Sequence, residues 1–497
     1  MKELPKIKIN GKPKYIKFAQ DVDFFTYFKK IEQAFDTCFI FESLGEEGQP
    51  AGQAGRFSRY SIFGFDPEHI ISAKGKTLVI DGEKYVVDNP YFALREIMPD
   101  RTFSKNYAGG LVGYLSYDAV NYFEPAVNVK AHKDFDQFLF GVYTDGLILD
   151  KLTNELFYFY FDRDRSEELR RLIFAATLLN GIRKRYGADC KSAPAENSGG
   201  IASSVASGDL LAMIKDFLRV TLCGDTLTKA EHKKIVERVR AQIIAGNIFQ
   251  CEVGFKTNFR VEGDVLRIYE ELRKVNPSPF MYYLKFGGKK IVGASPELAF
   301  SLRDGEMTVR PLAGTIRRGK DDAEDRQLAR MLLHDKKEIA EHTMLVDLYR
   351  NDIGKVARFG TVRIRDLLSV EKFSHVQHIS SEISGLTASG EDMFSAFAAN
   401  FPAGTLTGAP KIEAMKIIDA NEKEARGPYG GAVGHFGFNG DCTFAMAIRS
   451  LFVSGEKAYA QTSGGIVYDS VAEKEYDEIQ GKLAAMKQVL EEFGNEK

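Results

Sequence analysis

The sequence predicts an α+β fold in which packed β-sheets form the core and helices lie on the outside. Short β-rich segments dominate the first region, such as CFIFE at 38–42 and RYSIFGF at 59–65. Further along, strands and helices alternate without the regular spacing of βαβ units. With 497 residues, of which 44% are hydrophobic, the chain has material for one large core or two ordinary ones.

Two hairpins and a helix complete the first region. Asp81-Gly82, between TLVI and KYVV, is typical of a type I′ turn, and a second hairpin turns near Thr153-Asn154. The segment SEELRRLIFAATLLNGIRKRYG then predicts a helix. Residues 187–209 are rich in Ala, Ser and Gly and predict an exposed connector. We therefore divide the chain into an N-terminal region (15–186), this connector and a C-terminal region (210–490).

The C-terminal region begins with a helix and a strand. Thr228 and Glu231 form a capping box that starts the helix. In the following strand, FQCEVGF, alternate residues form an apolar face: Phe249, Cys251, Val253 and Phe255. Gln250, Glu252 and Gly254 therefore lie on the opposite face.

The remaining segments alternate between the two kinds of element. Strands are predicted for MYYLKF, KIVGA, MTVRP, AVGHFGFN and KAYAQTS, and helices for 324–350, IEAMKIIDANE and EKEYDEIQGKLAAMKQVL. A capping box of Ser470 and Glu473 is predicted to start the last helix.

The bulk properties exclude several classes of protein. The 67 Lys and Arg residues nearly balance the 69 Asp and Glu residues, so no net field favours nucleic acid, and a small-molecule substrate fits better. The start of the chain is polar, and no apolar run approaches the roughly 20 residues that a membrane helix needs. The cysteines form no C-x-x-C pair: Cys38, Cys190, Cys223, Cys251 and Cys442. We expect a cytoplasmic protein without a disulfide framework, nucleic-acid partner or membrane span.

Acidic side chains recur on two predicted helices. On one helix, Glu475, Glu478 and Lys482 have the spacing i, i+3 and i+7 and share one face. The other helix carries Glu338, Glu341 and His342, with Asp347 and Asp352 further along the chain. If both helices meet at one cleft, their carboxylates suit Mg²⁺, which prefers one or two protein carboxylates plus water and substrate oxygens. A solvated, salt-bridged helix face explains the same charges and is favoured from the residues alone.

Two Gly-rich loops, an arginine and a lone histidine are further candidates. The loop at 401–411 and Ser463-Gly464-Gly465 would present backbone N–H groups to a carboxylate, although tight turns explain either loop equally well. Arg449 needs a partner, and a substrate carboxylate and a structural ion pair are equally supported. His378, alone in a strand-like segment, is more typical of a satisfied core residue.

Long motifs along nearly the whole chain resemble the chorismate-utilising enzyme family. They occur in the family's order: GASPELAF, RPLAGTIRRG, EIAEHTMLVDLYRNDIGKV, VQHISSEISG, FPAGTLTGAPKIEAMKIIDANE, GPYGGAVGHFGFNG and SVAEKEYDEI. The resemblance implies two packed antiparallel β-sheets in a sandwich core with helices outside. Ala313 resembles the anthranilate-forming branch, since aminodeoxychorismate synthases typically have lysine there. Gln250 stands where isochorismate and salicylate synthases typically carry a lysine that activates water. Ammonia is therefore the implied nucleophile.

The resemblance also implies residue roles. Glu341 and Glu478 would coordinate Mg²⁺, with Glu475 supporting through water. Glu297 would be the general acid, and His378 would assist loss of the C2 proton. The implied carboxylate-binding residues are Gly314, Thr315, Tyr429, Arg449, Ser463, Gly464 and Gly465, and the pocket is completed by Thr405, Lys482 and Gln250. The chain departs from the family wording at Gly254, Tyr349 and His435, none of which is an implied metal ligand.

The resemblance further implies regulation and a partner. Phe41-Glu42-Ser43 and 276–281 resemble the LLES and NPSPYM elements that bind tryptophan in this family, although FESLG departs from LLESA. Feedback inhibition by L-tryptophan follows, with these candidate residues: Glu42, Ser43, Pro279, Phe280 and Met281. No cysteine lies in a Gly-rich nucleophile elbow, so ammonia would come from solution or from a separate glutamine amidotransferase subunit. In this family the synthase and amidotransferase subunits form a heterotetramer, and the resemblance implies the same assembly here.

Three alternatives share much of this evidence. An aminodeoxyisochorismate synthase would stop before pyruvate elimination. An aminodeoxychorismate synthase would have lost its usual lysine. A catalytically silent tryptophan-sensing subunit would need the inhibitor elements but not the acidic and imidazole residues that the chain retains.

Overall fold

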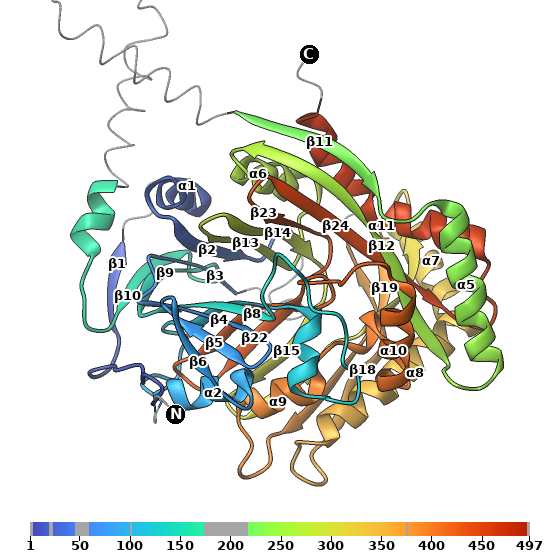
Figure 1. Cartoon of the computed structure of the whole chain (residues 1–497), viewed down its shortest axis with the longest axis horizontal. Coiled ribbons are helices and arrows are strands. Elements are labelled where there is room, and N and C mark those ends of the chain that lie inside the picture. Colours follow the sequence, from blue (N-terminus) through green and yellow to red (C-terminus); the bar gives the residue numbers. More distant parts are fainter. Residues whose placement is uncertain are drawn as a thin grey trace, which may run out of the picture.

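Two large antiparallel sheets organise the computed structural model, which describes residues 3–18, 23–44, 59–99, 102–172, 217–373 and 376–494. The described strands form two twelve-stranded sheets (Figure 1). The first sheet runs in the order β1 (Lys14–Phe18), β10 (Glu155–Tyr160), β9 (Asp145–Asp150), β3 (Tyr60–Phe65), β2 (Thr37–Glu42), β13 (Phe280–Phe286), β14 (Lys289–Ser295), β23 (Ser450–Ser454), β24 (Lys457–Ile466), β12 (Gln250–Gly263) and β11 (Leu218–Asp225), and β20 (Gly408–Ala409) pairs with β12.

The second sheet is built in the same way from early and late parts of the chain. Its order is β17 (Leu312–Arg317), β19 (Val376–Leu386), β16 (Glu306–Val309), β15 (Leu298–Arg303), β22 (Cys442–Met446), β21 (Ala432–Gly437), β7 (Gly110–Leu115), β8 (Phe138–Tyr143), β4 (His69–Lys74), β5 (Thr77–Ile80) and β6 (Glu83–Val86), and β18 (Arg363–Lys372) pairs with β19. Because β2 pairs with β13 and β7 with β21, the N-terminal and C-terminal regions share both sheets.

Alternation along the strands divides the apolar side chains between two cores. In β13, Tyr282 and Leu284 belong to the core between the two sheets, whereas Met281 and Tyr283 face the opposite core. That second core is covered by α1 (Phe24–Ala34), α6 (Leu266–Val275) and α11 (Ala472–Glu492). The predicted two-sheet sandwich with outer helices is therefore confirmed.

The predicted hairpins are confirmed by backbone geometry. Asp81 (φ 49°) and Gly82 (φ 83°) both adopt the left-handed conformation that a type I′ turn requires between β5 and β6. Asn154 (φ 53°) closes the turn between β9 and β10.

The remaining helices cover the flanks: α2 (Pro90–Ile97), α5 (Lys229–Ile244), α7 (Asp322–His334), α8 (Lys336–Gly354), α9 (Met393–Asn400), α10 (Lys411–Asn421) and the short 3₁₀ turns at Tyr117–Tyr122 and Gly404–Leu406. The Thr228 capping box of α5 is confirmed. On the strand after it, Cys251, Val253 and Phe255 pack in a third core with α5 and α10, as predicted. Phe249 does not, because it precedes β12 and is 69% exposed.

Two helix predictions are wrong. The single helix predicted at 324–350 is broken into α7 and α8 at Asp335, whose carboxylate caps α8 by accepting from the backbone N–H groups of Lys337 and Glu338. The predicted capping box at Ser470 is absent. Its hydroxyl instead accepts a hydrogen bond from the Val467 N–H, and α11 starts after Val471.

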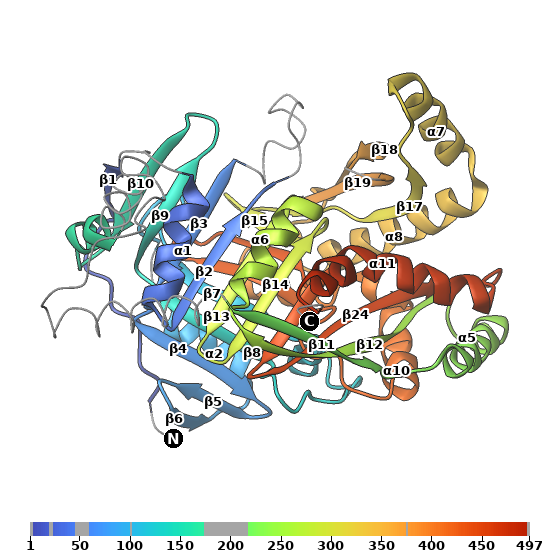
Figure 2. The same ribbon diagram turned by 90° about the horizontal axis from the view of Figure 1, so that it is seen from above.

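Some predictions lie partly outside the described residues. The helix predicted after the second hairpin begins at Ser166, and only 166–172 are described. The connector at 187–209 and Cys190 also lie outside them. Over the described ranges, no helix is long and apolar enough to cross a membrane. Figure 2 shows α7, α8, α10 and α5 at one end of the molecule and β1 with β10 at the other.

Candidate active site

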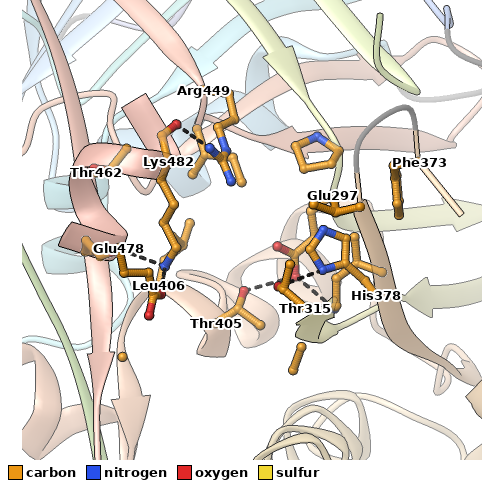
Figure 3. Close-up of a pocket in the computed structure, with 18 of the residues that line it drawn as sticks. Glu297, Thr315, Phe373, His378, Thr405, Leu406, Arg449, Thr462, Glu478 and Lys482 are labelled. Atoms are coloured by element: carbon orange, nitrogen blue, oxygen red, sulfur yellow. Dashed lines mark hydrogen bonds and ion pairs between the residues drawn. The ribbon is translucent and has the colours of Figure 1, made fainter. Parts of the chain in front are cut away.

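A cavity of about 880 Å³ lies where the first turns of α8 and the middle of α11 approach β12, β17, β19 and β24. Its lining includes all five residues predicted to be catalytic: Gln250, Glu297, His378, Thr405 and Lys482. Figure 3 shows Lys482, Glu478 and Arg449 on one side and His378, Thr315 and Glu297 facing them from the other. Residues more than 200 positions apart are thus brought to one space.

Six of the seven predicted substrate-binding residues line the same cavity: Gly314, Thr315, Tyr429, Arg449, Ser463 and Gly465. Gly464 lies immediately behind the wall. A Cβ at that position would lie 3.4 Å from Glu475 Oε2, which is van der Waals contact, so Gly464 lies directly beside this carboxylate.

Glu297 is a buried carboxyl between β14 and β15. Its Oε1 accepts hydrogen bonds from the Leu312 N–H (3.3 Å) and the Thr405 hydroxyl (3.1 Å). Burial outweighs these bonds and raises the pKa of Glu297 to about 8. At neutral pH the group is therefore a protonated acid that can donate.

His378, on β19, presents a neutral imidazole. Its Nδ1 lies 3.0 Å from the Gly314 carbonyl and 3.1 Å from the Thr315 hydroxyl. Because a carbonyl only accepts, Nδ1 carries the proton and Nε2 is left as a proton acceptor. Burial lowers the pKa of His378 to about 4. The core-residue interpretation of His378 is wrong, because the side chain lines the cavity.

Two cations lie together on the opposite wall. Arg449 has φ 52° and donates to the Lys482 carbonyl, and within the described ranges it forms no ion pair with a carboxylate. Lys482 Nζ donates to the Ser463 carbonyl (2.9 Å) and pairs with Glu478 (2.8 Å). Among the described residues, the structural ion pair considered for Arg449 is therefore absent, which leaves its guanidinium available for an anionic ligand.

The acidic stripe of α11 meets the acidic turn of α8 across the cavity. Glu338 and Glu341 line it from α8, and Glu475 and Glu478 line it from α11. Burial and then the neighbouring carboxylates raise the pKa of Glu341 to about 7, against the lowering effect of Lys337. Glu475 is only 6% exposed, so the solvated-face interpretation does not hold for it.

These carboxylates fit a cation in part. Glu475 Oε2 is buried without a hydrogen-bond partner among the described atoms. In the part of the chain that the structure describes, no three His, Cys, Asp or Glu side chains converge closely enough to form a complete metal site. A cation here would therefore need water or substrate oxygens, which is typical of Mg²⁺.

The other candidate metal ligands on α8 lie outside the cavity. Asp352 pairs with Lys411 and Lys355, and Asp347 pairs with Arg350. His342 is buried beside the Ser381 hydroxyl at 2.7 Å. The helix turns these three side chains away from the cavity, so the part of the metal hypothesis that included them is wrong.

Glu252 was not among the predicted site residues, although it lines the cavity. Its Oε2 accepts a 2.7 Å hydrogen bond from the Ser463 hydroxyl, which lies 2.8 Å from the Tyr429 hydroxyl. Burial raises the pKa of Glu252. The signal was present in the strand pattern, because Glu252 shares the inner face of β12 with Gln250.

The two segments predicted to bind tryptophan run side by side. Glu42 is opposite Met281 in the register of β2 and β13, and the Leu44 N–H donates to the Ser278 carbonyl at 2.9 Å. The Ser43 carbonyl accepts a hydrogen bond from the Lys151 ammonium at 2.7 Å, and Pro279 and Phe280 are half-buried. Asn276, Pro277 and Ser278 line the large cavity, so the segment touches the site.

Comparison with known proteins gives consistent matches along the chain. The model of the chorismate binding enzyme family matches residues 40–488. The chain is 48% identical over 98% of both chains to anthranilate synthase component 1 of Leptospira biflexa. It is 36% identical to the protein of the same name from Methanothermobacter thermautotrophicus, over 95% of this chain and 93% of that one.

Two solved structures match the fold of this chain. The fold matches anthranilate synthase component I of Streptococcus pneumoniae with a TM-score of 0.71 and 30% identity, over 89% of this chain and 93% of that one. It also matches the menaquinone-specific isochorismate synthase of Escherichia coli with a TM-score of 0.67, over 98% of this chain and 96% of that one. At 17% identity, the second match shows a shared fold alone.

Proposed function

The chain belongs to the chorismate binding enzyme family, and we propose that within this family it is component 1 of an anthranilate synthase. It converts chorismate and ammonia to anthranilate and pyruvate through 2-amino-2-deoxyisochorismate, the first committed step of L-tryptophan synthesis. The observation that carries the chemistry is the meeting of a protonated acid, Glu297, and a neutral base, His378, in one cavity. The proposed reaction breaks carbon–oxygen bonds, so the enzyme would act as a carbon–oxygen lyase.

The cationic wall suits the two carboxylates of chorismate. Arg449 has no acidic partner among the described residues, and Lys482 lies beside it. A guanidinium binds a carboxylate through two parallel hydrogen bonds. Gly314, Gly464 and Gly465, with the hydroxyl of Thr315, leave the backbone open to the same anionic groups.

The acidic wall suits Mg²⁺. Glu341 and Glu478 would hold the ion, and Glu475, whose Oε2 lacks a hydrogen-bond partner among the described atoms, would support it through water. When bound, the ion would neutralise the ring carboxylate of chorismate and polarise the ring for attack.

The acid and the base act in sequence. Glu297 protonates the departing 4-hydroxyl while ammonia adds at C2, and Thr405 orients the acid through its hydrogen bond. Nε2 of His378 then accepts the C2 proton as pyruvate leaves and the ring becomes aromatic. The Gly314 carbonyl and the Thr315 hydroxyl keep the imidazole in the tautomer that this step needs.

The nucleophile is ammonia. Ala313 and Gln250 line the cavity where other branches of the family typically carry a lysine for covalent catalysis or water activation. We propose a glutamine amidotransferase subunit as the ammonia source, in a heterotetramer. A reducing cytoplasm suits the free thiols of Cys38, Cys223, Cys251 and Cys442.

Tryptophan would regulate the enzyme from the contact between β2 and β13. Ser278 accepts a hydrogen bond from Leu44 and also lines the cavity. A ligand seated against Ser43, Pro279 and Met281 would therefore shift a segment that borders the substrate. This supports feedback inhibition by L-tryptophan.

The activity is tested by incubating the purified chain with chorismate, Mg²⁺ and ammonium at mildly alkaline pH, with and without tryptophan or a chelator. Equimolar anthranilate and pyruvate, suppressed by tryptophan and by chelation, are expected. A non-aromatic amine without pyruvate would identify an aminodeoxyisochorismate or aminodeoxychorismate synthase, and the position of the amino group would separate the two. Tryptophan binding without turnover would identify a silent sensor.

A further inference from the structure

Two side chains in the cavity have acceptor atoms for which the proposed mechanism names no hydrogen-bond donor. Gln250 and Glu252 follow one another on the inner face of β12 and are only 6% and 7% exposed. The Oε1 atom of Gln250 is buried with no hydrogen-bond partner among the described atoms. Glu252 takes part in none of the ion pairs of the described ranges, and its one hydrogen bond there, from Ser463, goes to Oε2. The buried amide oxygen of Gln250 thus lacks a donor, and Glu252 Oε1 accepts no hydrogen bond among the described residues.

Both side chains reach over the same glycine of the neighbouring strand. Glu252 is opposite Gly465 in the register of β12 and β24. A Cβ on Gly465 would lie 2.6 Å from Gln250 Nε2 and 2.7 Å from Glu252 Oε1, so any side chain here would fill the space between them. Half a turn of the amide exchanges its oxygen and nitrogen, so the open acceptor can also face Glu252.

The nearest cations do not fill this place. Lys482 directs its ammonium to the Ser463 carbonyl and to Glu478, and Arg426 donates to the backbone carbonyl of Glu252 and pairs with Glu422. Burial disfavours the charged form of Glu252, and a small donor-only cation beside it would stabilise that form. An ammonium ion, with four N–H donors and no acceptor, meets this requirement.

We propose that Gln250 and Glu252 form the docking site for the nitrogen nucleophile, which enters as an ammonium ion. The inference rests on the proposed function and assigns the site at which that reaction receives its second substrate. Mg²⁺ is better served by the four carboxylates of α8 and α11 than by one carboxylate and one amide.

The step balances in protons and electrons. Ammonium gives one proton to the Glu252 carboxylate and becomes ammonia. The nitrogen lone pair forms the C2–N bond, the double bonds of the ring shift, and the C4–O bond breaks with its electron pair on oxygen. Glu297 supplies the proton that turns this hydroxyl into water, and the new substituent remains as an ammonium group.

The test compares steady-state kinetics of the full chain with ammonium chloride as the varied substrate. Glu252→Gln keeps the shape of the side chain and removes the charge, so we expect the KM for ammonium to rise about tenfold or more. The KM for chorismate should change less than about twofold, because the carboxylate-binding wall is retained. Glu262→Gln, the same change on an outer part of β12, is the matched control and should resemble the unchanged chain in both constants.

Each other outcome overturns the inference in a recognisable way. An unchanged KM for ammonium in Glu252→Gln would show that the carboxylate does not contact the nucleophile. Equal losses for ammonium and chorismate, or a lowered melting temperature, would show that Glu252 only supports Ser463 and Tyr429. If the unaltered chain forms no anthranilate at any ammonium concentration, the proposed function fails, and this inference fails with it.

Discussion

Two groups of buried carboxylates differ in how the protein satisfies them. At the contact of β2 with α6, Glu42 receives hydrogen bonds from the Tyr269 hydroxyl (2.9 Å) and an ion pair from Arg273 (2.9 Å). In the cavity, Glu297 receives two weak hydrogen bonds and no cation within the described ranges, and Glu475 Oε2 receives no bond there. Both groups are almost fully removed from solvent.

The difference separates structure from function. A buried charge that has its partners within the chain holds elements together, and removing one partner is costly. Burial raises the pKa of both Glu42 and Glu297, but only a buried carboxyl without such partners is open to a ligand, which is typical of active sites. Four substitutions or conditions test this contrast, from the largest expected effect to the smallest.

Glu297→Gln should abolish most of the activity. The amide keeps the hydrogen bonds of the acid but cannot protonate the leaving hydroxyl, so kcat should fall by about 10²- to 10⁴-fold. Stability at neutral pH should not fall, because no ion pair of the described chain is lost. Anthranilate fluorescence and urea unfolding measure the two effects, and activity within a few-fold of the unchanged chain would contradict the assignment.

His378→Ala should stall the second half of the reaction. We expect anthranilate formation to slow by about 10²- to 10³-fold while the aminated intermediate accumulates, because the C2 proton loses its acceptor. Chromatography of the reaction mixture measures both species. Rapid anthranilate formation without an intermediate would refute the role of the imidazole.

Arg273→Met should destabilise the fold while leaving the catalytic residues in place. The change leaves Glu42 buried without its cation, which costs about 3 kcal/mol. Urea denaturation measures the loss. The double variant Glu42→Gln/Arg273→Met is the control and should recover part of it, because the unpaired charge is removed as well. Equal stability of the single and double variants would contradict the interpretation of Glu42 as a structural carboxylate.

The pH dependence should report Glu297. Because the acid must be protonated, kcat/KM for chorismate at saturating ammonium should fall above pH 8, by about tenfold per pH unit. The folded pKa lies above the unfolded pKa, so the contribution of Glu297 to stability is full below pH ~4.5 and is lost as the pH rises through about 8. The unchanged chain should therefore lose stability relative to Glu297→Gln as the pH rises from 5 to 8, and a difference that does not change with pH would contradict the raised pKa.

The sequence by itself determined the local structure and the membership of the site. The turn at Asp81-Gly82, the cap at Thr228 and the alternation after Gln250 depend on residues a few positions apart, so short-range rules predict them. The family motifs pointed to Glu297, Glu341, His378 and Glu478, which the structure brings to one cavity.

Only the tertiary structure decided which charges are partnered. Spacing along α8 made Glu341, Asp347 and Asp352 equal candidates, but pairing with Lys411 and Arg350 removes the two aspartates from the cavity. In the same way, Glu252 was a residue on a strand face until the register of β12 with β24 placed it over Gly465. The physical reason is that burial, and with it the cost of an unpaired charge, depends on strands and helices that lie far apart in the chain.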